Sequence, residues 1–309
     1  MSDKFIVSTS PHVHSKFSTR GIMGAVLLAL APAGITSAYF IGYRSFAVMA
    51  VCVAACVLSE WVWQKYIMKT KSTISDLSAA VTGLLIAYNL PPDIPFYMAV
   101  CGCVFAIIVV KQFYGGIGCN IVNPALAARA MMLISWPTAM TTWTLQGMSG
   151  ATPLAAMKAG QAVKISCWDL LVGNMGGCIG ETCSVLLILG GLYLIWEEVI
   201  SWRIPVIYIA TAAILGQLFG HGSAVYEIFT GGLLLGAIFM ATDYTTSPMT
   251  PKGQIIYAFG CGLLTALIRT WGGYPEGVSF SILIMNIAVP LIDQYTAPKI
   301  FGAVKKGGK

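Results

Sequence analysis

The chain has 309 residues, of which 57% are hydrophobic and only 10% are charged, and its formal net charge is +6. A water-soluble domain carries about a quarter charged residues, so this composition excludes a soluble fold and indicates an integral membrane protein. The basic residues are spread over tails and loops. The charge therefore carries information about orientation in the membrane, and we expect no nucleic-acid partner.

The first twenty residues are polar, and the first apolar run begins at Gly21. No small-residue cleavage site follows a short apolar region, so we expect the chain to be retained whole, without a cleaved signal peptide. Residues 1–20 are predicted to form a cytoplasmic N-terminal tail.

About ten apolar segments follow, and a bilayer span needs about 20 such residues. Two segments, 76–90 and 123–137, are short for a span. The other eight are predicted at 21–40, 44–64, 95–112, 180–196, 203–220, 224–241, 254–270 and 278–296. A polar loop follows the fifth segment, and a short apolar piece at 168–176 precedes the sixth.

This pattern divides the chain into a first five-helix repeat (21–137), a polar loop (138–166), a second five-helix repeat (167–297) and a basic tail (298–309). Basic clusters precede the first span, follow the second and follow the tenth. An even number of spans separates them, so they share one side, which the positive-inside rule makes cytoplasmic. The loop 138–166 follows an odd span and is predicted to face outward. A lipid bilayer is the expected environment.

The two halves resemble each other. Thr82-Gly83-Leu84-Leu85 is echoed by Thr230-Gly231-Gly232-Leu233-Leu234, and Tyr114-Gly115-Gly116 by Trp271-Gly272-Gly273. Five spans per half is an odd number, so the second half must be inverted relative to the first. The predicted fold is an all-α integral membrane protein with about ten transmembrane helices in two inverted five-helix repeats, including broken or short helices, as in transporters.

The nine cysteines form no C-x2-C pair. Most lie in or beside apolar segments, where cysteine behaves as a small buried hydrophobe. The alternative is an iron–sulfur site shared with a partner subunit, for which Cys119, beside a glycine-rich turn, is the best candidate. No spacing typical of a zinc or haem site occurs.

The string Ser149-Gly150-Ala151-Thr152-Pro153-Leu154 lies in the polar loop. Its small residues leave the Thr152 hydroxyl open to a modifying enzyme, and Pro153 biases Thr152 toward an extended conformation. By its residues alone the string is either an exposed turn or a modification site.

A second constellation runs from Tyr114 to Pro124 and contains three glycines, which let the backbone approach a ligand closely. Asn123 is a predicted N-cap, with Pro124 in the first turn of the helix. Asn120 and Asn123 could read the edge of a ring system. The alternative is a capped re-entrant turn whose asparagines satisfy only backbone groups.

Acidic residues within or beside spans are expensive, and each is a functional hypothesis. They are Glu60, Glu181, Glu227, Asp243 and Asp293. Hard cations prefer oxygen ligands, and Asp243 has Thr242, Thr245, Thr246 and Ser247 beside it. Asp243 is therefore the first candidate for cation coupling, followed by Glu60 and Asp293. For the last two the alternative is an interfacial residue whose side chain reaches toward water. No firm metal site is predicted.

The loop string resembles the flavinylation motif of the RnfD and NqrB family. Asn123-Pro124-Ala125-Leu126-Ala127-Ala128-Arg129-Ala130, and Ala241-Thr242-Asp243 with Ser247-Pro248, resemble two further signatures of that family, in the same order. The short N-terminal tail is similar to that of RnfD. The resemblance implies a covalent FMN on Thr152 through a phosphoester bond, next to Ser149 and Gly150, and a non-covalent riboflavin, for which we consider Asn120 and Asn123. One departure is Gln146, which stands where the family often has an acidic residue.

The resemblance also implies a function. Members of the family belong to complexes that move electrons between ferredoxin and NAD⁺ and couple this transfer to export of Na⁺ or H⁺. The expected partners are the complex subunits A, B, C, E and G, especially the flavin-bearing G subunit. The alternative function is a transporter or channel without redox activity, because inverted repeats and broken helices fit it equally well.

Overall fold

A computed structural model describes residues 18–70, 72–142, 144–145, 148–149, 171, 177–181, 183–220, 224–273 and 276–298. Apart from one hairpin of two short strands, the regular elements among these residues are helices. Five are long and apolar enough to cross a membrane, namely Thr19–Ile41, Tyr43–Ile67, Phe96–Tyr114, Pro251–Trp271 and Val278–Thr296. The chain is therefore a helical, multi-pass membrane protein, as its composition predicts.

The first set of elements covers residues 19–149. It consists of α1 (Thr19–Ile41), α2 (Tyr43–Val62), η1 (Trp63–Ile67), η2 (Ile74–Asp76), α3 (Ser78–Tyr88), α4 (Phe96–Val104), η3 (Phe105–Lys111), η4 (Gln112–Tyr114), α5 (Pro124–Ser135), α6 (Pro137–Thr141), β1 (Thr144–Leu145) and β2 (Met148–Ser149). The two strands pair antiparallel. The segments predicted to be short, 76–90 and 123–137, form the short helices α3 and α5.

The second set covers residues 179–296. It consists of η5 (Ile179–Glu181), α9 (Ser184–Trp196), α10 (Arg203–Leu218), α11 (Ala224–Phe229), α12 (Leu233–Leu235), η6 (Gly236–Met240), α13 (Pro251–Trp271) and α14 (Val278–Thr296). The segment 224–241 is interrupted between α11 and α12, where Gly231 and Gly232 have φ angles of 70° and 64°. Glycine adopts this left-handed conformation without steric cost, so the helix breaks there.

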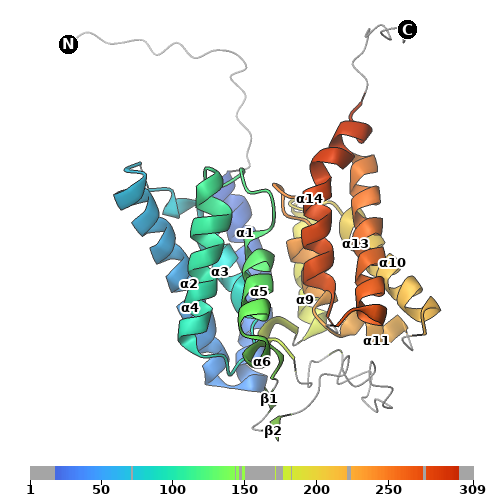
Figure 1. Cartoon of the computed structure of the whole chain (residues 1–309), viewed down its shortest axis with the longest axis horizontal. Helices are drawn as coiled ribbons and strands as arrows, with labels where there is room; N and C mark the ends of the chain where they lie inside the picture. The colour runs from blue at the N-terminus through green and yellow to red at the C-terminus, as the bar shows by residue number, and fades with distance from the viewer. Residues whose placement is uncertain are drawn as a thin grey trace, which may run out of the picture.

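The two sets stand side by side, and the start of α1 and the end of α14 lie at the same end of the molecule (Figure 1). The β1–β2 hairpin lies at the opposite end. Helix α1 packs against α9, and α5 packs against α14. We call the first end the tail end and the second the hairpin end.

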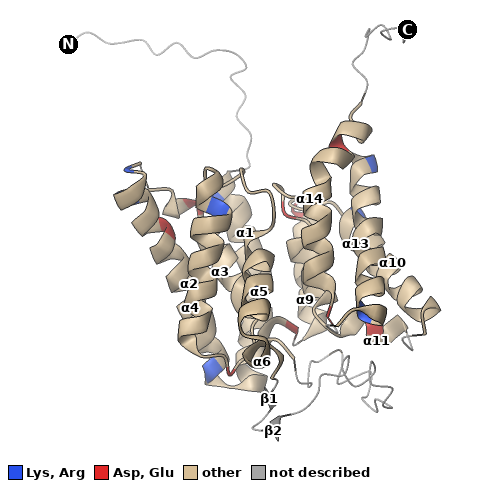
Figure 2. Ribbon diagram, viewed as in Figure 1, with Lys and Arg blue, Asp and Glu red and all other residues tan. Residues whose placement is uncertain are grey.

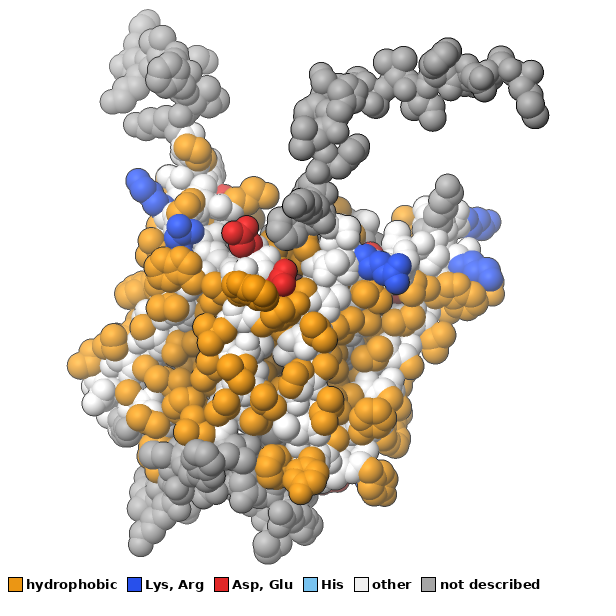
Figure 3. All heavy atoms as spheres, turned by 180° about the vertical axis from the view of Figure 1, so that it is seen from behind, with side chains coloured by type: hydrophobic (Ala, Val, Ile, Leu, Met, Phe, Trp, Pro, Cys, Tyr) orange, Lys and Arg blue, Asp and Glu red, His pale blue; other side chains and the backbone are white. Residues whose placement is uncertain are grey.

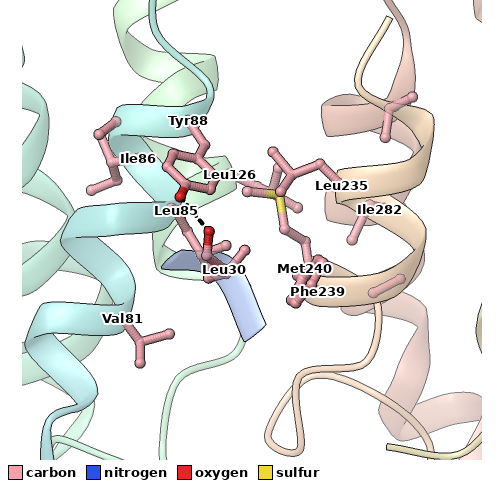
Figure 4. Close-up of a cluster of buried hydrophobic side chains, with 14 of the residues drawn as sticks. Leu30, Val81, Leu85, Ile86, Tyr88, Leu126, Leu235, Phe239, Met240 and Ile282 are labelled. Carbon is pink, nitrogen blue, oxygen red and sulfur yellow. Dashed lines mark hydrogen bonds between the residues drawn. The ribbon is translucent and has the colours of Figure 1, made fainter. Parts of the chain in front are cut away.

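Buried apolar side chains of both sets pack against one another where the sets meet (Figure 4). Leu30 and Leu126 come from the first set, and Met240 and Ile282 come from the second. The hydroxyl of Tyr88 on α3 donates a 2.7 Å hydrogen bond to the Leu30 carbonyl oxygen on α1. In a bilayer, such packing and internal hydrogen bonds hold helices together, since lipid tails are as apolar as the core.

Glycines allow helix backbones to approach closely. A Cβ atom on Gly83 of α3 would lie 2.8 Å from the Cys52 carbonyl oxygen and from the Val53 Cα of α2. A Cβ atom on Gly190 of α9 would lie 2.6 Å from the Ala29 carbonyl oxygen of α1. Small residues at helix contacts are typical of membrane proteins.

The lateral surface is apolar, and charged side chains gather toward the ends of the helices (Figures 2 and 3). Large hydrophobic side chains such as Leu28, Ile214 and Ile287 are 59–66% exposed. Such side chains suit contact with lipid or with other membrane helices.

Candidate functional site

A cavity of about 350 Å³ lies between the two sets of helices, near the start of α1. This volume is in the range of pockets that bind small organic molecules. Its apolar lining includes Ile22, Met23, Val26, Val81, Leu85, Leu194, Val199, Ile200 and Phe239. Its polar lining includes Ser78, Lys111, Asn120, Asn123, Thr242, Asp243 and Thr245. A mostly apolar cavity with a few polar groups suits a ligand that has an apolar body and a polar edge.

The turn before α5 brings Asn120 and Asn123 to this cavity. Gly115, Gly116 and Gly118 in the turn have φ angles of 116°, 97° and 87°. These values favour glycine, and they let the chain fold back after η4.

The Asn123 side chain has a structural role. Its Oδ1 accepts hydrogen bonds from the backbone N–H groups of Ala125 (3.0 Å) and Leu126 (3.4 Å), which caps α5. Its Nδ2 donates to the Met240 carbonyl oxygen of η6, at 3.2 Å. Asn123 thus ties the two sets together, as the capped-turn alternative predicts for this residue.

The Asn120 side chain makes fewer hydrogen bonds within the protein than the Asn123 side chain does. Its Nδ2 donates to the Val122 carbonyl oxygen at 3.1 Å, and its side chain lines the same cavity as the Asp243 carboxyl group. Of the two asparagines, Asn120 is therefore better placed to contact a ligand.

Asp243 follows η6 and faces the same cavity. Its Oδ2 accepts hydrogen bonds from the hydroxyl groups of Thr245 (3.0 Å) and Thr246 (3.2 Å). Burial raises the pKa of the Asp243 carboxyl above its usual range, although hydrogen bonds from Thr245, Thr246 and Asn120 favour the ionised form. An acid held this way can take up a proton or hold a cation.

Glu60 is buried and already neutralised. Its Oε2 lies 2.8 Å from the Lys111 Nζ, with the side chains 1% and 4% exposed. Lys111 also donates to the Ser78 hydroxyl at 2.6 Å, and Gln64 donates to Glu60 Oε1 at 3.2 Å. Lys111 thus compensates the carboxylate that was a candidate for cation coupling, and it also lines the cavity. Lys111 was not among the predicted site residues, and its one signal in the sequence is a lysine at the end of an apolar run.

Asp293 lies in the last turn of α14, outside the cavity lining. Its Oδ1 accepts a hydrogen bond from the Met249 N–H at 3.2 Å. The structure therefore does not bring the three predicted cation-coupling acids together, and only Asp243 faces the cavity.

The flavinylation string lies almost wholly outside the described residues. Ser149 ends strand β2 and pairs with Thr144, at the hairpin end of the molecule. Gly150 and Thr152 are outside the described part of the chain. Ser149 and the cavity around Asp243 thus lie at opposite ends of the helices.

A second polar cluster surrounds Arg129 of α5. The guanidinium group pairs with Glu276 and donates to the Asn89 Oδ1 and the Ser279 hydroxyl, each at 3.0 Å. It also lies 3.6 Å from the Cys178 Sγ. Arg129 therefore links the first set, through α5 and the end of α3, to the second set at the start of α14.

Cys178, Glu181 and Glu276 bring one thiol and two carboxylate oxygens within 4.8 Å of one another. Thiolate and carboxylate are possible metal ligands. Here the Arg129 guanidinium group already compensates Glu276 and contacts the thiol, so these three side chains are better explained as part of a charge network than as a metal centre.

Comparison with known proteins decides the family. Residues 6–302 match the NQR2, RnfD, RnfE family. The chain belongs to this family. The resemblance to the RnfD and NqrB family is thereby confirmed.

Individual relatives of this family match over nearly their whole length. The chain is 50% identical to the D subunit of the Na⁺-translocating ferredoxin:NAD⁺ oxidoreductase complex of Acetobacterium woodii, over 97% of this chain and 96% of the relative. It is 45% identical to the D subunit of the proton-translocating ferredoxin:NAD⁺ oxidoreductase complex of Clostridium ljungdahlii, over 96% of each chain. It is 34% identical to the D subunit of the ion-translocating oxidoreductase complex of Aliivibrio salmonicida, over 98% of this chain and 99% of the relative.

The names of the first two relatives differ in the cation, although their identities to this chain are similar. Membership of the NQR2, RnfD, RnfE family therefore does not decide between Na⁺ and H⁺.

Proposed function

We propose that this chain is the membrane-embedded D subunit of an ion-translocating ferredoxin:NAD⁺ oxidoreductase in the cytoplasmic membrane of a bacterium. The observation that carries this proposal is the 50% identity to a relative of that name, over 97% of the chain. The partners would be subunits A, B, C, E and G, with the flavin-bearing G subunit as the electron-transfer neighbour. Ferredoxin and NAD⁺ would bind to other subunits.

The proposed architecture has ten crossing segments in two inverted sets. The first set would be α1, α2, α3, α4 with η3, and α5; the second would be α9, α10, α11 with α12 and η6, α13, and α14. A buried basic residue near the end of the fourth segment of each set supports the inversion. Lys111, at the end of the fourth segment of the first set, pairs with Glu60; Arg269, near the end of the fourth segment of the second set, pairs with Glu227. These fourth segments end at opposite ends of the molecule (Figure 1).

The cavity near the tail end fits a non-covalent flavin such as riboflavin. An apolar lining from both sets would enclose the ring system, Asn120 would meet its polar edge, and the Lys111 ammonium group would supply positive charge. A bound flavin supplies one- and two-electron redox chemistry, while the protein supplies position and electrostatics.

Thr152 would carry a second flavin, FMN, through a phosphoester bond on its side-chain oxygen, with Ser149 and Gly150 as neighbours. The paired strand β2, which ends at Ser149, places the start of this string at the hairpin end. A covalent tether holds the cofactor without relying on binding affinity. The two flavin positions would then lie toward opposite faces of the membrane.

Asp243 would couple cation movement to electron transfer. It faces the proposed riboflavin cavity, is held by two threonine hydroxyl groups and Asn120, and has a raised pKa. Replacement of Asp243 by Asn should lower cation transport per electron in the assembled complex. Unchanged transport and turnover would remove Asp243 from this role.

Mass spectrometry of the chain, purified from cells that contain the flavin transferase, tests the redox assignment. We expect one added FMN on wild type and on the control Thr144→Val, and none on Thr152→Val, which should also lose in-gel flavin fluorescence. An unmodified wild-type chain would favour the transporter without redox activity.

A further inference from the structure

Glu181 has a buried carboxylate that belongs neither to the proposed flavin sites nor to the surroundings of Asp243. It is the last residue of η5, which packs against α3 and precedes α9 in the chain. Glu181 is 9% exposed. Its Oε2 faces Gly177, where an added Cβ would lie only 2.5 Å away. Its Oε1 faces Gly232 and accepts no hydrogen bond from any described residue. One oxygen of this carboxylate is therefore buried without a partner among the described residues, and a buried oxygen without a donor costs free energy.

The two arginines near Glu181 already pair with other carboxylates. Arg129 pairs with Glu276, and Arg269 pairs with Glu227 and donates to the carbonyl oxygens of Thr230 and Gly231. Both guanidinium groups attract the Glu181 carboxylate, but neither hydrogen-bonds it. Two arginines and three glutamates leave one carboxylate in excess among the described charges of this cluster.

A small hollow adjoins this carboxylate. It has a volume of about 10 Å³ and is lined by Glu181, Ser184, Gly232 and the apolar side chains Leu187, Ile228 and Phe229. A hollow of roughly this size holds about one water-sized particle. Gly232 at φ 64° precedes α12, and the lack of a side chain there keeps the space in front of Oε1 open.

A cation would relieve both the excess charge and the unpartnered oxygen. A buried, uncompensated carboxylate either binds a proton or holds a positive ion. The size of the hollow excludes a hydrated divalent ion or an organic cation. Sodium is a hard ion and prefers oxygen ligands, which a carboxylate and the hydroxyl group of Ser184 would offer.

We propose that Glu181 is a binding site for one small monovalent cation, either a proton or a sodium ion. The site is separate from Asp243, which faces the cavity near the tail end. All of its proposed ligands come from this chain, and cation binding there does not require a bound flavin. Any part it has in ion translocation rests on the proposed function.

Carbodiimide labelling of the purified full-length chain tests the proposal. Dicyclohexylcarbodiimide reacts with protonated carboxyl groups in apolar surroundings and adds as a whole, without a leaving group. We expect peptide mass spectrometry to find the label on Glu181, with a rate that falls about tenfold per pH unit above the pKa. Glu181→Gln should abolish it, and Glu276, paired with Arg129, should stay unlabelled.

Sodium chloride, compared with choline chloride at the same ionic strength, distinguishes the two cations. Protection by sodium assigns a sodium site, and labelling that responds to pH alone assigns a proton site. Glu181 that stays unlabelled in the folded chain at every pH, while the unfolded chain is labelled, would overturn the proposal. Equal labelling of Glu276 would also overturn it, because it would indicate general access of the reagent.

A second readout does not depend on the reagent. Binding of sodium to the folded chain alone should raise its melting temperature with NaCl but not with choline chloride. Glu181→Gln should remove this rise if the labelling assigns sodium, whereas persistence of the rise would overturn that assignment. The flavin mass measurement is independent, so a failure of the proposed function and a failure of this site are distinguishable.

Discussion

The Lys111 ammonium nitrogen lies 2.8 Å from a Glu60 carboxylate oxygen, and both side chains are almost fully buried. The pair joins the end of η3 to α2, 51 residues earlier. Removal of one partner leaves an uncompensated charge inside the helix bundle, whereas removal of both does not.

We therefore expect Lys111→Met to destabilise the chain by about 3–5 kcal/mol. The double variant Lys111→Met with Glu60→Gln should recover much of this loss. The measurement is unfolding by SDS in mixed micelles. The control is Arg44→Met, which breaks the half-exposed Arg44–Asp93 pair and should cost about 1 kcal/mol or less. A double variant as unstable as the single one would contradict this view of the pair.

The contact between α3 and α2 gives a second prediction. Gly83→Ala should destabilise the chain by about 1–3 kcal/mol, because the new Cβ would meet the backbone of Cys52 and Val53 at 2.8 Å. Gly24→Ala on α1 is the matched control, since nothing lies within 4 Å of its added Cβ. SDS unfolding should separate the two variants, and equal stabilities would show that α2 and α3 can move apart.

The pH dependence of stability tests Asp243. Burial raises the pKa of this carboxyl, so the folded chain binds its proton more tightly than the unfolded chain does. This contribution is fully present below the unfolded pKa, about 3.9, and is lost as the pH rises through the folded pKa. Asp243→Asn removes it. The melting temperature of the variant relative to wild type should therefore rise as the pH increases from about 4 through the folded pKa. A constant difference would contradict the raised pKa.

The hydrogen bond from Tyr88 to Leu30 tests the packing of α3 on α1. Tyr88→Phe should cost about 1 kcal/mol, because the Leu30 carbonyl oxygen would lose its 2.7 Å donor inside the core. Tyr39→Phe, at an 84% exposed position of α1, should change the stability little. Thermal unfolding in detergent measures the stability of both variants. Equal stabilities would show that the hydrogen bond from Tyr88 to Leu30 does not stabilise the fold.

Several local features of the fold could be predicted from the sequence. The apolar runs predicted α1, α2, α13 and α14, and the short runs predicted the short helices α3 and α5. Asn123 before Pro124 predicted a capped helix start, and the cap is present. These features depend on residues close together in the chain.

The pairing of distant residues could not be predicted in this way. Glu60 was a candidate for cation coupling, and the structure pairs it with Lys111, from another helix. Asp243, Glu60 and Asp293 were separate candidates for cation coupling, and of the two aspartates only Asp243 lines the cavity. Helix packing decides which buried charges meet, and a sequence pattern carries little information about that geometry.

The sequence by itself determined that the chain is an integral membrane protein and that it resembles the NQR2, RnfD, RnfE family. Both depend on composition and short strings. Only the tertiary structure decided that Asp243 and Asn120 share a cavity, that Lys111 neutralises Glu60, and that Glu181 is left in excess beside two paired arginines. The physical reason is that burial and charge compensation depend on which helices pack together, and that packing exists only in the folded chain.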